Sequence, residues 1–129
     1  MTGSGKGEQR LWAVRGATKV GRNDAGQIVS ATEELMRELI SRNELDAEAI
    51  VSCIFTCTHD LNAEFPAVAA RNLGLNQVPL LCGQEIDVPN SMRGIVRVLV
   101  HYYAARDHTP AHTYLGEAQE LRSDLDAAQ

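Results

Sequence analysis

The chain has 129 residues, which is enough for one ordinary domain and too few for two. Hydrophobic residues make up 44% and charged residues 22%, a balance typical of globular proteins that excludes a disordered chain. The net charge of −5 argues against nucleic acid as the main partner, because duplex binding depends on a basic surface.

The cysteine count and the ends of the chain predict its compartment and its domain limits. Three cysteines, no signal-peptide pattern and no long apolar run predict reduced thiols in a cytoplasmic protein without a membrane segment. Residues 1–10 are polar and rich in glycine, so we expect a disordered extension there. Residues 11–125 are expected to form a single domain, with residues 116–129 as a mobile tail.

The first predicted elements are a strand from Leu11 to Gly16 and a helix over 25–42. Asp24 is suited to cap the helix, with Gln27 in the capping-box position three residues later. Apolar residues recur at helical spacing, so one stripe of the helix should face a sheet. That stripe contains Ile28, Thr32, Leu35, Met36, Leu39 and Ile40.

The remaining elements are four strands and one short helix. The run 47–58 is the clearest strand, and its alternation predicts one apolar face of Val51, Cys53, Phe55 and Cys57. Pro66 is suited to begin a short helix that ends before Gly74. Further strands are predicted over 78–82, 92–103 and 112–115.

This order of elements predicts an α/β (α+β) fold with a mixed sheet and both helices on one face. Both faces of the strand 92–103 are largely apolar, yet two helices can cover only one side of a sheet. The other side would be an exposed apolar patch in a monomer, so a symmetric oligomer is expected.

Arg97 interrupts an apolar face in the middle of that strand. A guanidinium does not lose its proton on burial, so it needs an anionic or hydrogen-bonding partner. An internal salt bridge to a carboxylate such as Glu85 is one solution, a strand at the edge of the sheet is a second, and an anionic ligand is a third. Arg15 and Arg71 also need anionic or hydrogen-bonding partners. Three converging arginines would suit a substrate with two carboxylates.

Other catalytic patterns are missing. The sequence has no G-x-S-x-G elbow, no H-E-x-x-H motif and no paired C-x-x-C, so no metal site is expected. Two alternatives stay open. One is a thiol or metal enzyme that uses Cys82 with a histidine, and the other is a non-catalytic module that binds small anions. Glu85 argues against the second, because a pure anion receptor gains nothing from a carboxylate there.

Five motifs in order carry a family resemblance. They are RGAT at 15–18, T-x-D-L-x-A-x-F-P-A at 58–67, C-x-Q-E at 82–85, I-x-R-V at 95–98 and Tyr114-Leu115. Each motif is weak, but the ordered set is highly specific and resembles the α/β class of monofunctional chorismate mutases over about residues 11–125. The resemblance implies a homotrimer with a barrel-like core of packed sheets and active sites between adjacent subunits. It also implies the rearrangement of chorismate to prephenate without a cofactor, for which no nucleophile is needed.

The resemblance also implies roles for individual residues. Arg97 would donate to the ether oxygen of the breaking bond, and Glu85 would accept from the ring hydroxyl with Cys82 beside it. Arg15 and Tyr114 would hold a carboxylate. The other substrate-binding positions implied are Arg71, which would help to hold the second carboxylate, and Phe65, Ala67, Leu80, Leu81 and Leu121.

Several features of this chain depart from the family pattern or strain it, among them a loop between Arg71 and Pro79 that is one residue shorter. Val68 and Leu81 stand where the pattern has a lysine near the site mouth and a threonine beside the cysteine. Cys82 and Glu85 are three residues apart, so a regular strand would point them to opposite faces. Both would line one cleft only if the chain bends near Gly83.

Overall fold

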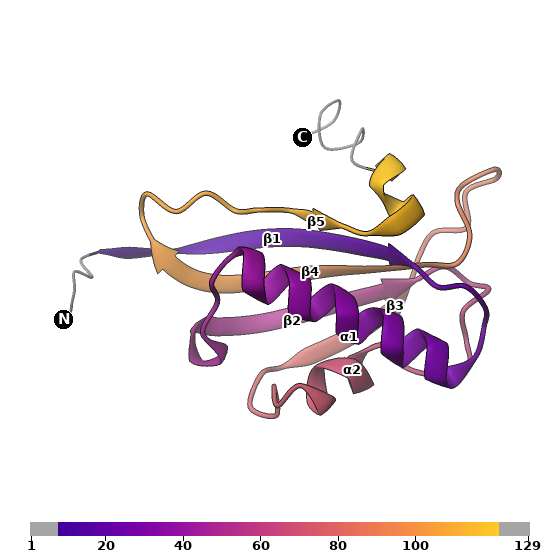
Figure 1. Cartoon of the computed structure of the whole chain (residues 1–129), viewed down its shortest axis with the longest axis horizontal. Coiled ribbons are helices and arrows are strands. Elements are labelled where there is room, and N and C mark those ends of the chain that lie inside the picture. Colours follow the sequence, from indigo (N-terminus) through magenta and orange to yellow (C-terminus); the bar gives the residue numbers. More distant parts are fainter. Residues whose placement is uncertain (1–7, 122–129) are drawn as a thin grey trace.

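The computed structural model describes residues 8–121 and contains one five-stranded mixed sheet of order β3-β2-β4-β1-β5. Helices α1 and α2 lie together on one side of this sheet (Figure 1). The predicted order of elements and the mixed sheet with helices are confirmed. The elements are β1 (Gln9–Lys19), α1 (Ala25–Arg42), η1 (Ala47–Ala49), β2 (Ile50–Cys57), α2 (Ala67–Asn72), β3 (Leu80–Gln84), β4 (Ile95–Ala105), β5 (Thr113–Tyr114) and η2 (Gly116–Leu121).

Helix α1 has the predicted bounds because its start is specified locally. The carboxylate of Asp24 accepts a hydrogen bond from the Gln27 backbone N–H at 3.0 Å, which satisfies one of the first-turn donors. Five of the six residues in the predicted stripe are buried against the sheet, and Ile40 is half-buried. Among the described residues, no helix is long and apolar enough to span a membrane.

The two predicted ends of the domain need correction. β1 begins at Gln9 because β4 extends to Ala105 and pairs with Gln9 and Arg10, so these two residues are not part of a disordered extension. At the other end, 116–121 forms η2, which packs on the sheet through buried Ala118. The rest of the predicted extension and tail, residues 1–7 and 122–129, lies outside the described residues.

Strand β2 departs from the predicted alternation at its start. The pairing of β2 with β4 shifts register between Ile50 and Ser52. A bulge of this kind adds one residue to a strand and reverses its alternation locally. Ile50 is therefore buried, whereas Val51, predicted on the apolar face with Cys53, is 41% exposed.

The side of the sheet opposite α1 and α2 is here called the open face. On β4, Val96, Val98, Val100 and Tyr102 are buried on the helix side, and the alternate residues lie on the open face. The open face comprises Leu11, Ala13, Arg15 and Ala17 of β1, Ile54 and Thr56 of β2, Leu81 of β3, and Ile95, Arg97, Leu99, His101 and Tyr103 of β4. Leu81 is 64% exposed and Tyr103 is 47% exposed, so much of this face is apolar and uncovered in one chain.

Candidate active site

Arg97 lies at the centre of the open face and forms an ion pair with Glu85. In the sheet it stands between Ala17 of β1 and Thr56 of β2. Its Nε is 3.3 Å from Glu85 Oε2, and the two side chains are 31% and 25% exposed. Arg97 Nε is buried and has no aligned hydrogen-bond acceptor within residues 8–121. The salt bridge considered from the sequence is therefore present, but it leaves the guanidinium with donors for a further partner.

Glu85 is anchored at the point where β3 ends. Its backbone N–H donates to Cys57 O at 2.8 Å, which continues the pairing of β3 with β2 by one residue. The Thr56 hydroxyl donates a short hydrogen bond to Glu85 Oε2, the oxygen nearest Arg97. Thr56 was not among the predicted site residues, because its partner lies 29 positions away and only strand pairing brings them together.

Arg15 and Tyr114 lie on the open face at the other edge of the sheet. Arg15 pairs with Leu99 of β4, one pleat away from the position of Arg97. Tyr114 pairs with Ala17 in parallel register and is 5% exposed, within a small apolar cluster that includes Ile95 and Ala118. Leu121 packs against the same cluster, so the structure places it on the open face as well.

Cys82 points to the opposite side of the sheet from Glu85. It pairs with Phe55, a fully buried residue, and its side chain packs against the main core on the helix side. The pairing of β3 is regular from Leu80 to Gln84, so the chain does not bend at Gly83. Within one chain, therefore, the thiol does not stand beside Glu85 as expected. Period-two alternation is the reason.

The other predicted substrate-binding residues also divide between the two sides. Leu81 is on the open face, whereas Leu80 pairs with Cys53 and packs into the main core. Ala67 is buried in α2. Phe65 precedes that helix and is 67% exposed, and Arg71 is exposed at its last turn.

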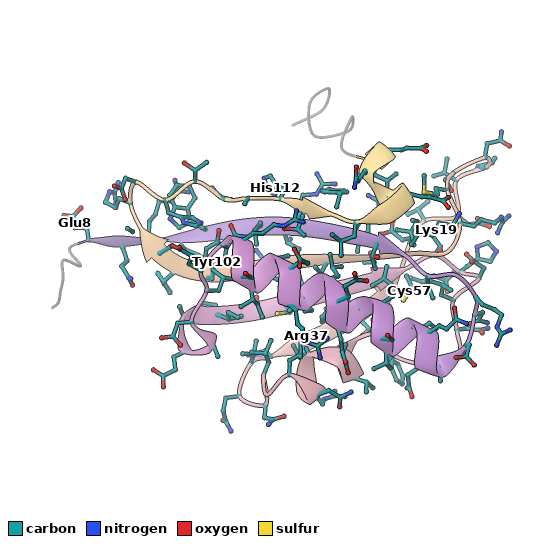
Figure 2. All side chains as sticks on the ribbon, viewed as in Figure 1. Glu8, Lys19, Arg37, Cys57, Tyr102 and His112 are labelled. Atoms are coloured by element: carbon teal, nitrogen blue, oxygen red, sulfur yellow. The ribbon has the colours of Figure 1, made fainter. Side chains whose placement is uncertain are left out.

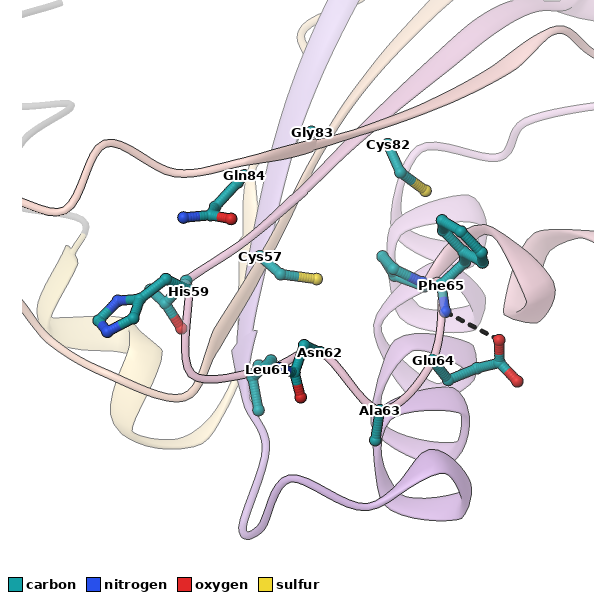
Figure 3. A pocket seen from close by; sticks show the side chains of 12 residues that line it. Cys57, His59, Leu61, Asn62, Ala63, Glu64, Phe65, Cys82, Gly83 and Gln84 are labelled. Atoms are coloured by element: carbon teal, nitrogen blue, oxygen red, sulfur yellow. Dashed lines mark hydrogen bonds between the residues drawn. The ribbon is translucent and has the colours of Figure 1, made fainter.

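A cavity of about 390 Å³ opens where the parallel strands β2 and β3 end. Its wall includes Phe65 and Cys82, together with Cys57 and the turn that follows β2 (Figure 3). It therefore contains two of the predicted site residues, whereas Arg97 and Glu85 do not line it. Ligand sites at the carboxyl ends of parallel strands are common, which makes this cavity a second part of the candidate site.

The buried thiols are not set up as nucleophiles. Burial raises the pKa of Cys53 to about 12. Burial, together with the nearby Cys82, Glu85 and Asp60, raises the pKa of Cys57 to about 11. Both groups stay protonated at neutral pH, and a thiol is a poor nucleophile. Within residues 8–121 no cluster of three or more His, Cys, Asp or Glu side chains could hold a metal ion.

Comparison with known proteins assigns the family. The family model for chorismate mutase type I matches residues 11–125. The chain is 40% identical over 121 residues to a chorismate mutase AroH from Thermus thermophilus, covering 90% of this chain and 97% of that protein. It is 36% identical over 115 residues to the chorismate mutase AroH of Bacillus subtilis (strain 168), covering 87% and 90%. A solved chorismate mutase from Clostridium thermocellum is 44% identical, superposes with a TM-score of 0.80, and covers 84% of this chain and 98% of that one. This chain belongs to the type I chorismate mutase family.

Proposed function

We propose that this chain rearranges chorismate to prephenate, with the ion pair of Arg97 and Glu85 on the open face as the centre of its active site. Chorismate mutase activity follows from membership of the family, and it makes the chain an isomerase of aromatic amino acid biosynthesis. The alternative of a non-catalytic anion-binding module is not favoured, because both curated relatives and the solved structure are chorismate mutases.

Arg97 is proposed to stabilise the charge that develops on the ether oxygen as the carbon–oxygen bond breaks. The rearrangement is intramolecular, so the protein supplies conformer selection and electrostatic stabilisation in place of a nucleophile. A central strand position and the contact with Glu85 hold the guanidinium in a defined orientation before substrate binds. The buried Nε without an aligned acceptor is the observation that supports this role most directly.

Glu85 is proposed to accept a hydrogen bond from the ring hydroxyl of chorismate. Its side-chain contacts with Arg97 and Thr56 both fall on Oε2, which leaves Oε1 to accept from a ligand. Arg15 and Tyr114 are proposed to hold one carboxylate of the substrate, and Arg71 the other, because a planar guanidinium fork matches a carboxylate.

The two groups of residues lie on opposite sides of one sheet, so we propose that they meet between subunits. Arg97, Glu85 and their neighbours are on the open face, whereas Phe65 and Cys82 line the cavity on the helix side. A homotrimer that covers the open faces in a barrel-like core would bring the cavity of one subunit to the open face of the next. The exposed apolar residues of that face support such burial. The three free thiols support a cytoplasmic location.

The activity is tested by following the ultraviolet absorbance of chorismate with purified protein and converting the product with acid to identify prephenate. We expect enzyme-dependent loss of chorismate with stoichiometric formation of prephenate. No conversion by a correctly folded oligomer would overturn the proposal and favour the anion-binding module.

The shared site is tested by mixing two inactive variants. Arg97→Ala removes a group from the open face, and Arg71→Ala removes one from the helix side. Unfolding and refolding them together should restore part of the activity, because mixed oligomers contain some interfaces with both groups intact. Mixing Arg97→Ala with Arg15→Ala is the matched control, since both changes affect the same face. Equal behaviour of the two mixtures would show that the site is not shared in this way.

A further inference from the structure

The edge strand β5 carries Tyr114 and forms few backbone hydrogen bonds of its own. It consists of Thr113 and Tyr114, and within residues 8–121 its one strand partner is β1. Two paired residues at a sheet edge form few backbone hydrogen bonds. The packing of Tyr114 with Ile95 and Ala118 and the contacts of the segment that leads into β5 therefore share in fixing its register.

Asn43 supplies that contact through its side-chain amide. It follows the last residue of α1, is 4% exposed, and faces Ala111. Asn43 Nδ2 donates to Ala111 O at 3.0 Å, and Asn43 Oδ1 accepts from Ala111 N at 2.7 Å. The amide thus bonds both backbone groups of one residue, as the facing residue of an antiparallel strand would. Its other N–H donates to Leu39 O at 2.9 Å, so both amide hydrogens and the oxygen are used.

The same segment is joined to the backbone of Arg15. The Arg15 N–H donates to His112 Nδ1 at 3.0 Å, and Leu115 N–H donates to Ala17 O at 3.0 Å. His112 lies on the segment that runs beside β1 (Figure 2). His112, the residue after Ala111, is therefore bonded to Arg15. Two residues after His112, Tyr114 is in register with Ala17.

We propose that Asn43 is a positioning residue that sets Tyr114 and Arg15 in place for a substrate carboxylate, from the far side of the sheet. The proposal rests on the carboxylate-binding role given to Arg15 and Tyr114 above. Asn43 does not touch the substrate itself. Its loss leaves two backbone groups of Ala111 without their partner and releases the register of β5, so Tyr114 samples positions away from the carboxylate.

The experiment is a double-mutant cycle between Asn43→Ala and Tyr114→Phe, with kcat and KM for chorismate measured for all four proteins. We expect Asn43→Ala alone to raise KM about tenfold with kcat nearly unchanged, the pattern of lost binding shared by ground and transition states. In the Tyr114→Phe background the same change should raise KM by a clearly smaller factor, about threefold, because only Arg15 is then left to be misplaced. Equal effects in both backgrounds, or an unchanged KM with a lowered melting temperature, would reduce Asn43 to a structural residue.

Further variants keep the test decisive and separate it from the proposed function. If Asn43→Ala does not fold, Asn43→Asp keeps the size and the acceptor for Ala111 N–H and removes the donors, and His112→Ala removes the tie to Arg15. Asn43→Asp and His112→Ala should each raise KM for chorismate. His112→Asn should have a near-normal KM, because its amide oxygen returns an acceptor near the position of Nδ1. Unchanged KM values for Asn43→Asp and His112→Ala would overturn the proposal. A normal KM for Tyr114→Phe alone would instead contradict the role of Tyr114, and so the proposed function of the site.

Discussion

Replacement of Arg97 by alanine should separate catalysis from stability. The ion pair with Glu85 is partly open to solvent, since the two side chains are 31% and 25% exposed. A pair that is mostly buried contributes more than a surface pair and less than a fully buried one, so the free energy of unfolding should fall by about 1–3 kcal/mol. Loss of a preorganised donor at a developing negative charge costs about 3–4 kcal/mol, so kcat should fall by about 10²–10³-fold.

The assay compares kcat and KM for chorismate with the urea-unfolding midpoint of the same preparations. Arg97→Lys keeps the charge but not the planar fork, and we expect it to lose most of the activity as well. Arg106→Ala is a matched control, because Arg106 pairs through Nε with Glu8 at 3.5 Å in a more exposed position. The control should keep near-normal turnover. An Arg97→Ala enzyme within about tenfold of the original kcat would refute the reasoning, because the lost transition-state stabilisation would be too small for a donor at a developing charge.

Two further predictions concern the core. Burial raises the pKa of Cys53 to about 12, and the pKa of Cys57 is raised to about 11. Iodoacetamide at pH 8 should therefore modify only Cys82 in the native protein, which intact-mass measurement would detect. Labelling of either buried thiol before unfolding would contradict this prediction. A methyl group at Gly16 would lie 3.1 Å from two leucine side chains and a backbone oxygen, so Gly16→Ala should cost about 1–3 kcal/mol in urea unfolding. Gly83→Ala meets nothing within 4 Å and should change stability by less than about 0.5 kcal/mol, so equal effects at the two glycines would contradict the packing.

Local features of the chain could be predicted well from the sequence. The bounds of α1 depend on a cap three residues from its partner and on an apolar stripe with a 3.6-residue period. The uncovered face of the sheet follows from the alternation along β4, and so does the position of Arg97 on that face. The same alternation correctly indicated that Cys82 and Glu85 point apart, against their expected placement side by side.

Features that depend on strand pairing needed the tertiary structure. The bulge that exposes Val51 depends on how β2 meets β4, and nothing in the local pattern marks it. The contact of Thr56 with Glu85, and the bonds of Asn43 with Ala111, join residues 29 and 68 positions apart. Register between distant strands is set by the packing of the whole sheet, which a period along one segment does not contain.

The sequence was thus sufficient to indicate which chemistry this chain performs, and the fold showed how its parts are arranged. The ordered motifs around Arg97 and Glu85 indicated the reaction through a family resemblance. The arginines by themselves indicated only that a dianion would bind, because charge and donor geometry belong to the residues themselves. The division of the predicted site between the open face and the helix side is determined by how the strands pair in the sheet. A strand has two faces, and which residues share a face with a distant strand is known only once the strands are paired.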